Sequence, residues 1–165
     1  MPFDIFLDRD GTLIKDTGYI SSIVDVEVMD GVFEGLKLFK SKNYRLHIIS
    51  NQSGVPRGKI LPQAFSDVEK HFYKVFFLQN IEFDSVSYCF HLPTENCECR
   101  KPKIGLFEKI SNEYQIEKRA SAMLGNSEVD KSAAQNFRIP FWKVEESGID
   151  FYQTAREVVS YFGGN

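Results

Sequence analysis

Two carboxylates stand two residues apart, directly after the first apolar run of the chain. Residues 3–7 predict a short buried strand, and Asp8 and Asp10 follow it, with Gly11 permitting a sharp turn behind them. Ligands of open α/β sheets bind outside the carboxyl ends of the strands. We therefore expect a nucleophilic carboxylate and a second acidic group to face one crevice.

The cysteines form a second chemical feature. Cys89, Cys97 and Cys99 lie within eleven residues of one another, together with His91, one of three histidines in the chain. Thiolate and imidazole are the ligands of closed tetrahedral zinc sites, which are structural because no position stays open for water. We expect zinc to order residues 89–100. Reduced, unligated thiols are the alternative, and the odd number of cysteines disfavours a disulfide framework.

Three further polar segments follow predicted strands. Residues 50–54 offer hydroxyl, amide and backbone N–H groups suited to an oxyanion, and residues 100–103 supply cations suited to a phosphate. Residues 124–130 deliver an amide and carboxylates. Each segment also has an ordinary interpretation, as a loop, a solvated charge run or a helix cap. Their chemistry therefore depends on their meeting Asp8 at one edge of a sheet.

The apolar pattern along the chain alternates between strands and helices. Strands are predicted at residues 3–7, 44–49, 85–89, 120–124 and 140–144. Helices are predicted at 30–42, with Asp30 as the cap, and at 62–76, 105–114, 130–136 and 150–162. This order predicts an α/β fold with a parallel sheet covered by helices on both faces. We expect one domain over residues 1–165, without an inserted lid.

Composition limits the classes of partner. The 165 residues are 42% hydrophobic and carry a net charge of −3, without a basic stripe. A nucleic-acid partner is therefore not expected. No apolar stretch approaches the roughly 18 residues of a membrane span, and no signal peptide is evident, so we expect a cytoplasmic protein with no membrane partner. A small enzyme without a lid is also expected to be a monomer.

Three motifs together resemble a known family. They are FLDRDGT at residues 6–12, NQSGVPRGK at 51–59 and CFHLPTENCECRKP at 89–102, followed by LGNSEVD at 124–130. The set is similar to the haloacid dehalogenase (HAD) superfamily of phosphotransferases. Within it, the zinc loop resembles the small lidless branch that contains D-glycero-D-manno-heptose 1,7-bisphosphate phosphatase and histidinol-phosphate phosphatase. The resemblance implies a three-layer, Rossmann-like fold without a cap domain.

The resemblance also implies roles for individual residues. Asp8 would be the nucleophile that forms an aspartyl-phosphate, and Asp10 the acid and then the base. Ser50 and Lys101 would hold phosphoryl oxygens. Mg²⁺ would be held by Asp8, the backbone carbonyl of Asp10 and the side chain of Asn126. Charge neutralisation and positioning would then supply most of the rate gain.

One residue departs from the family pattern. Asn126 stands where the family usually has aspartate, so one unit of negative charge is missing beside the expected metal. We expect weaker Mg²⁺ binding, with Glu128 and Asp130 as candidates for compensation. A phosphate-binding protein without catalytic activity is the alternative if the metal is lost.

Substrate choice must come from loops beside the site. Residues 15–20 are candidates, and Asn51, Gln52, Arg57, Lys59 and Arg100 are predicted to bind the substrate. The cations suit a small metabolite that carries a second phosphate, so a sugar bisphosphate is favoured. Histidinol phosphate is the alternative, although its amine would want an acidic pocket.

Overall fold

The protein is built on a five-stranded parallel sheet. The computed structural model describes residues 2–145 and 150–163, so the ends of the predicted domain, residues 1 and 165, lie outside the described residues. The strand order is β3-β2-β1-β4-β5, and neighbouring strands are parallel throughout. The strands are β1 (Asp4–Leu7), β2 (Arg45–Asn51), β3 (Ser85–Cys89), β4 (Ser121–Gly125) and β5 (Phe141–Lys143).

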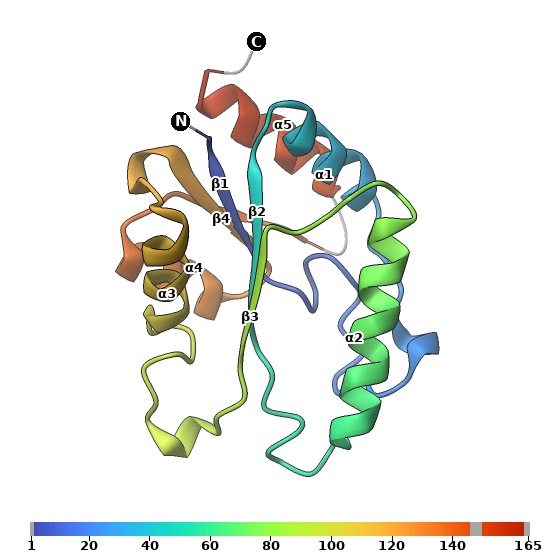
Figure 1. Cartoon of the computed structure of the whole chain (residues 1–165). Coiled ribbons are helices and arrows are strands. Elements are labelled where there is room, and N and C mark those ends of the chain that lie inside the picture. Colours follow the sequence, from blue (N-terminus) through green and yellow to red (C-terminus); the bar gives the residue numbers. More distant parts are fainter. Residues whose placement is uncertain (1, 146–149, 164–165) are drawn as a thin grey trace.

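Helices cover both faces of the sheet. In Figure 1, α1, α2 and α5 lie on one side of the sheet, and α3 and α4 lie on the other. The helices are α1 (Val32–Ser41), α2 (Pro62–Phe77), α3 (Gly105–Tyr114), α4 (Glu128–Phe137) and α5 (Phe151–Tyr161). The predicted three-layer α/β fold is confirmed. All strands run toward the lower edge of Figure 1, where their carboxyl ends carry the loops of the site.

Strand β1 is buried on both faces because it supplies two cores. Ile5 and Leu7 belong to the cluster under α1, α2 and α5, while Phe6 belongs to the cluster under α3 and α4. Alternate residues of a strand point to opposite faces, so a central strand reads as a continuous apolar run. Phe6 packs against Phe107 and Phe137 with ring centroids 4.8 Å and 5.9 Å apart. These contacts fix β1, and with it the start of the site.

Two predicted helix starts are wrong. The N-cap of α1 is Gly31 with a φ of 74°, and no side chain caps this helix, so Asp30 does not have the predicted role. Helix α4 begins at Glu128 instead of residue 130, because Ser127 is its N-cap. The Ser127 hydroxyl accepts the N–H of Asp130, and the Asp130 carboxylate accepts the N–H of Ser127. This capping box draws Asp130 into the first turn.

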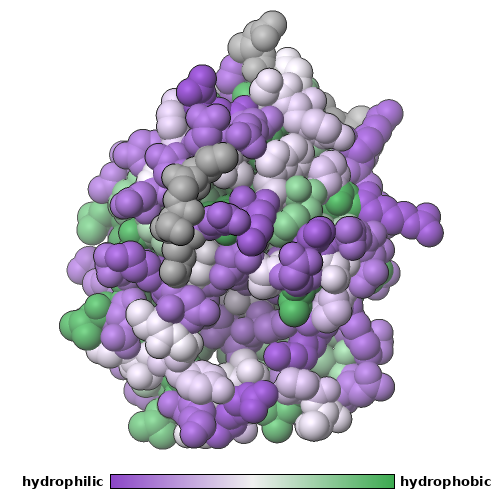
Figure 2. Space-filling model, turned by 180° about the vertical axis from the view of Figure 1, so that it is seen from behind, coloured by the Kyte–Doolittle hydropathy of each residue, from purple (hydrophilic) through white to green (hydrophobic). Residues whose placement is uncertain are grey.

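Among the described residues, the face seen in Figure 2 carries no large hydrophobic patch, because its hydrophobic residues form small separate spots among hydrophilic ones. In the part of the chain that the structure describes, every helix is too short or too polar to span a bilayer.

Gly35 provides a test of the packing between α1 and α5. A Cβ at this position would lie 2.5 Å from the Phe151 ring and 3.2 Å from Ala155. Alanine normally favours a helix over glycine by about 1 kcal/mol, but overpacking costs about 1–3 kcal/mol. We expect Gly35→Ala to lower the free energy of unfolding by about 1–2 kcal/mol, measured by urea denaturation.

The double variant Gly35→Ala/Phe151→Leu is the control for this prediction. Shortening the Phe151 ring removes the clash, so the double variant should be more stable than the sum of the two single changes predicts. Strict additivity would contradict the packing argument.

Candidate active site

Asp8 lies at the point where β1 leaves the sheet. Its N–H donates to the carbonyl of Leu124 on β4 at 3.1 Å, so the backbone of Asp8 is still paired. The chain then turns through Gly11, whose φ is 80° and whose ideal Cβ would be 2.1 Å from the side-chain amide of Asn126. Only glycine allows Asn126 this close to the turn. The turn after β1 and the loop after β4 are thereby pressed together, as predicted from the parallel sheet.

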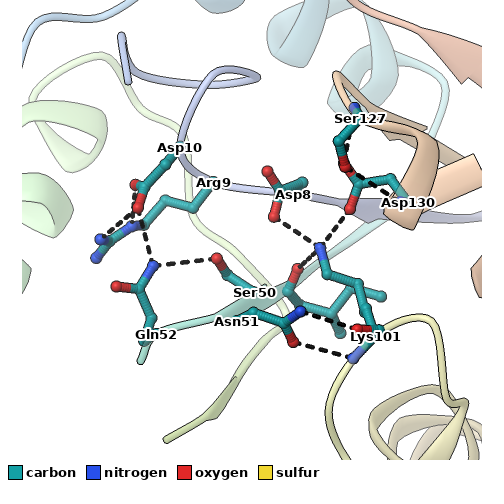
Figure 3. A network of polar contacts seen from close by, with 10 residues as sticks. Asp8, Arg9, Asp10, Ser50, Asn51, Gln52, Lys101, Ser127 and Asp130 are labelled. Atoms are coloured by element: carbon teal, nitrogen blue, oxygen red, sulfur yellow. Dashed lines mark hydrogen bonds and ion pairs between the residues drawn. The ribbon is translucent and has the colours of Figure 1, made fainter. Parts of the chain in front are cut away.

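A buried lysine joins three segments at Asp8 (Figure 3). The Nζ of Lys101 donates to Oδ1 of Asp8 at 2.7 Å, to Oδ1 of Asp130 at 2.6 Å and to the carbonyl of Ile49 at 2.9 Å. An ammonium has three N–H donors, so all three are used. Lys101, predicted to bind phosphate, is therefore bound to Asp8, the predicted nucleophile.

The electrostatics of Asp8 follow from its surroundings. Burial raises the pKa of Asp8 to about 6, the Lys101 ammonium counteracts part of this rise, and the negative charge of Asp130 adds to it. A cation beside the carboxylate would favour its charged form and so its nucleophilic form. Positive charge bound at the site would therefore favour the ionised form of Asp8.

The backbone of Lys101 is held by a side chain. Asn51 donates its amide N–H to the carbonyl of Lys101 at 3.0 Å, and its amide oxygen accepts the N–H of Lys101 at 3.0 Å. Asn51 was predicted to bind substrate, and it lines the cavity, but both of its polar groups are used to fix Lys101. Its position at the end of β2 attaches the loop after β3 to the sheet.

Asp10 lies beside Asp8 and has a set of partners of its own. Its carboxylate accepts from Arg9 Nε at 2.7 Å, from Arg9 Nη2 at 3.1 Å and from Gln52 Nε2 at 3.0 Å. The same Gln52 amide donates to the Ser50 hydroxyl at 3.1 Å. Ser50 and Gln52, both predicted for the site, are therefore connected to Asp10 (Figure 3).

These groups surround one cavity of about 290 Å³. Its lining includes the predicted residues Ser50, Gln52 and Asn126 and also Tyr19 and Ile20 of the loop that the sequence offered as a substrate contact. The charged residues of the lining are Asp8, Asp10, Asp16, Asp130 and Lys101. With four carboxylates against one ammonium, the cavity suits a divalent cation.

The donor set fits Mg²⁺. Asp8 offers a carboxylate oxygen and Asn126 an amide oxygen on the same cavity, and hard cations prefer oxygen ligands. The two candidates for compensation differ in position. Glu128 has a side chain 80% exposed, lies 3.6 Å from Lys131 and is not among the described residues that line the cavity, while Asp130 lines it and is bound to Lys101 and Ser127. Of the two, Asp130 is therefore the one that brings negative charge to the cavity.

Three predicted substrate-binding cations lie outside the cavity. Arg57 and Lys59 are exposed, and neither is among the described residues of its lining. Arg57 donates to the Ser53 hydroxyl at 3.3 Å. Arg100 donates to the carbonyl of His91 at 3.2 Å and lines a second cavity of about 270 Å³, which shares Lys101 with the first.

The predicted zinc ligands meet in one cluster. The ligand atoms of Cys89, His91, Cys97 and Cys99 all lie within 4.8 Å of one another. Sγ of Cys89 is 3.6 Å from Sγ of Cys97 and 3.5 Å from Nδ1 of His91. Ligands of tetrahedral zinc are about 3.5–3.8 Å apart, from metal–ligand bonds of about 2.0–2.3 Å. Sγ of Cys99 lies closer, 3.0 Å from Sγ of Cys89 and 3.1 Å from Nδ1 of His91, so the four ligand atoms are near enough to bind one ion such as zinc.

Sequence reasoning missed the residues behind Asp10. Arg9 is fully buried and pairs with Glu69 of α2, and Glu69 accepts from the hydroxyls of Tyr73 and Tyr88. A signal was available, because Glu69 occupies the apolar face of α2 that Phe65, Val68 and Phe72 define. A charged residue on a buried helix face requires a partner.

Comparison with known proteins places the chain in a family. Residues 4–133 match the family model described as polynucleotide kinase 3 phosphatase. The chain belongs to this family of HAD phosphatases, which are hydrolases of phosphate monoesters.

Individual relatives carry a more particular name. The chain is 39% identical to D-glycero-beta-D-manno-heptose-1,7-bisphosphate 7-phosphatase of Helicobacter pylori, over 82% of this chain and 79% of that protein. It is 35% identical to D-glycero-alpha-D-manno-heptose-1,7-bisphosphate 7-phosphatase of Campylobacter jejuni, over 96% and 94% of the two chains. The fold matches the D,D-heptose 1,7-bisphosphate phosphatase of B. bronchiseptica, solved with magnesium and phosphate. That match has a TM-score of 0.88 and 21% identity and covers 98% of this chain and 99% of the other.

The zinc cluster yields a prediction. We expect inductively coupled plasma mass spectrometry to find one zinc ion per chain in the wild-type protein and none in Cys99→Ser. Because metal binding contributes to folding, the melting temperature should fall by about 5–10 °C in the variant. His71→Gln is the control, since His71 lies on α2 away from the cluster and should keep both zinc and stability. The zinc site would be refuted if the wild-type protein contained no zinc and had the same melting temperature as Cys99→Ser.

Proposed function

We propose that this chain is a Mg²⁺-dependent D-glycero-D-manno-heptose 1,7-bisphosphate 7-phosphatase. The observation that carries the proposal is the carboxylate of Asp8, which faces a cavity and has the Lys101 ammonium 2.7 Å away. The names of relatives that align over 82–96% of the chain support the choice of substrate. Both anomers occur among those names, so the anomer is left to experiment.

Hydrolysis would proceed in two displacements. Asp8 attacks phosphorus, the bond from phosphorus to the sugar oxygen breaks, and Asp10 gives that oxygen a proton. Water then attacks the aspartyl-phosphate, Asp10 takes a proton from the water, and the bond from phosphorus to Asp8 breaks to release inorganic phosphate. The acid of the first step is regenerated by the second. Asp8 and Asp10 suit these roles because both line the same cavity.

Other groups would hold the transferred phosphoryl. Lys101 and Ser50 lie on the cavity and are proposed to bind the phosphoryl oxygens, where they stabilise developing charge. Mg²⁺, held by Asp8, the backbone carbonyl of Asp10 and Asn126, would neutralise charge between the carboxylate and the phosphate. Arg100, which lines the second cavity, is proposed to meet the rest of the substrate. Gln52, which lines the first cavity, and the exposed Arg57 and Lys59 are proposed as further substrate contacts.

We also propose that residues 1–165 work as a single-domain monomer in the cytoplasm. A reducing compartment keeps thiols available to zinc. Size-exclusion chromatography with light scattering tests the oligomeric state. A mass of about twice the 19.0 kDa of one chain would refute the monomer.

The first test is phosphate release with Mg²⁺ from heptose 1,7-bisphosphate and from histidinol phosphate. We expect kcat/KM to favour the bisphosphate by at least about 10²-fold, because a site built for a second phosphate leaves polar groups unpaired with the wrong substrate. Asp8→Asn should abolish turnover of both. A preference for histidinol phosphate, or turnover that survives in Asp8→Asn, would refute the proposal. A protein that binds the bisphosphate without any turnover would be the non-catalytic alternative.

Asn126 yields a separate prediction for the metal. Asn126→Asp restores a carboxylate beside the proposed Mg²⁺, so we expect the Mg²⁺ concentration for half-maximal activity to fall by about 10-fold. Glu128→Gln is the matched control. It removes a carboxylate that points to solvent, and it should leave the Mg²⁺ requirement unchanged. Equal requirements in wild type and Asn126→Asp would contradict a metal at this position.

A further inference from the structure

We propose that Arg9 and Glu69 are positioning residues that orient the carboxyl group of Asp10 for proton transfer. The inference rests on the proposed function, in which Asp10 is the acid and base. It concerns residues that do not touch the substrate, because Arg9 is completely buried and Glu69 belongs to α2 behind it. The pair connects a long surface helix to the reacting groups.

Arg9 holds Asp10 by two parallel contacts. Its Nε lies 2.7 Å from one carboxylate oxygen of Asp10, and its Nη2 lies 3.1 Å from the other. A guanidinium that binds both oxygens of a carboxylate fixes the plane of the carboxylate as well as its distance. A lysine ammonium would preserve the charge but could not fix the plane. The contact therefore restricts rotation of Asp10 about its side-chain bond.

The guanidinium itself is fixed from three sides. Its remaining Nη1 donates to Oε1 of Glu69, and its central carbon lies 5.6 Å from the Phe65 ring centroid and 5.5 Å from that of Tyr88. Cation–π contacts at this distance hold the plane of an arginine against aromatic surface. Arg9 therefore has a single orientation, which it passes on to Asp10.

Two tyrosines fix Glu69 in turn. The Tyr88 hydroxyl donates to Oε2 of Glu69 at 2.6 Å, and the Tyr73 hydroxyl donates to the same oxygen at 3.1 Å. Burial raises the pKa of Tyr73 to about 12 and that of Tyr88 well above its ordinary value, so both stay protonated donors. Both oxygens of Glu69 are therefore engaged, and its charge faces only Arg9 and these hydroxyls in the described structure.

Net stability is a weak explanation for this network. Buried ion pairs gain little, because removing two charges from water offsets their attraction. The geometry has a second consequence that stability does not require: each contact restricts the next, from Tyr88 through Glu69 and Arg9 to Asp10. Gln52 completes the arrangement from the cavity side, with its amide 3.0 Å from Asp10. The network thus ends on the group that must transfer a proton.

The leaving group provides a test that a purely structural role would not affect. The sugar oxygen at carbon 7 leaves as a primary alkoxide and needs the proton of Asp10, whereas p-nitrophenolate leaves without one. For Glu69→Gln and for Tyr88→Phe, we expect kcat/KM to fall by about 10–10²-fold for alkyl phosphates but by no more than about 3-fold for p-nitrophenyl phosphate. Arg9→Lys should behave like Glu69→Gln, because charge without the fork does not orient the carboxyl group.

Arg45→Lys is the matched control. Arg45 also binds both oxygens of a buried aspartate, Asp4, at 2.6 Å and 2.9 Å, but at the opposite end of β1 from the site. It should lower the melting temperature and leave the ratio of the two kcat/KM values unchanged. Tyr88→Phe removes one hydroxyl and keeps the ring, so it tests the inference even if a charge variant fails to fold.

Equal losses on both kinds of substrate, or no loss on either, would overturn the inference. Failure of the proposed function has a different signature, namely no Asp8-dependent turnover of heptose 1,7-bisphosphate by the wild-type protein. Glycerol 3-phosphate, another alkyl phosphate with a primary alkoxide, is therefore included. Its ratio to p-nitrophenyl phosphate decides the role of Arg9 and Glu69 independently of the natural substrate.

Discussion

The structure depends on one buried ammonium. The side chain of Lys101 is only 2% exposed to solvent, and its three N–H groups donate to Asp8, Asp130 and the carbonyl of Ile49. A buried charge must be paired, so this one contact forces the ends of β1 and β2, the first turn of α4 and the loop after β3 to meet. The cavity lies at this meeting point. The same interaction thus joins the edge of the sheet and sets the arrangement of charges in the cavity.

The loop after β3, which carries Lys101, is fixed at two places. Cys99 stands two residues before Lys101 and belongs to the cysteine–histidine cluster, while Asn51 fixes the backbone of Lys101 itself. Residues 90–100 contain only a short 3₁₀ turn, Pro93–Glu95, so the cluster supplies order that regular structure does not. A zinc ion held by all four ligands would leave no position open for catalysis, but it would in this way position Lys101 in the candidate active site.

A second buried network lies beside Asp10. Lys101 joins Asp8 to Asp130 of α4, whereas Arg9 joins Asp10 to Glu69 of α2. Asp8 and Asp10 therefore have different environments although only one residue separates them. Asp8 has a raised pKa because burial outweighs Lys101, while Asp10 lies in a fork of hydrogen bonds. Different environments suit the different roles proposed for the two carboxylates, attack by Asp8 and proton transfer by Asp10.

The sequence by itself determined that the sheet is parallel, the order of strands and helices along the chain, and the members of the cysteine–histidine cluster. These follow from local periodicity and from spacing along the chain. It also indicated Asp8, Asp10, Ser50 and Lys101 through their positions after strands. Only the tertiary structure decided that Asp130 is bound to Lys101, that Asn51 holds a backbone, and that Arg57 and Lys59 lie outside the cavity. It alone revealed the connection from Glu69 to Asp10. The physical reason is that these pairs of buried charges join residues 29, 60 and 93 positions apart, separations over which neither propensity nor periodicity carries information.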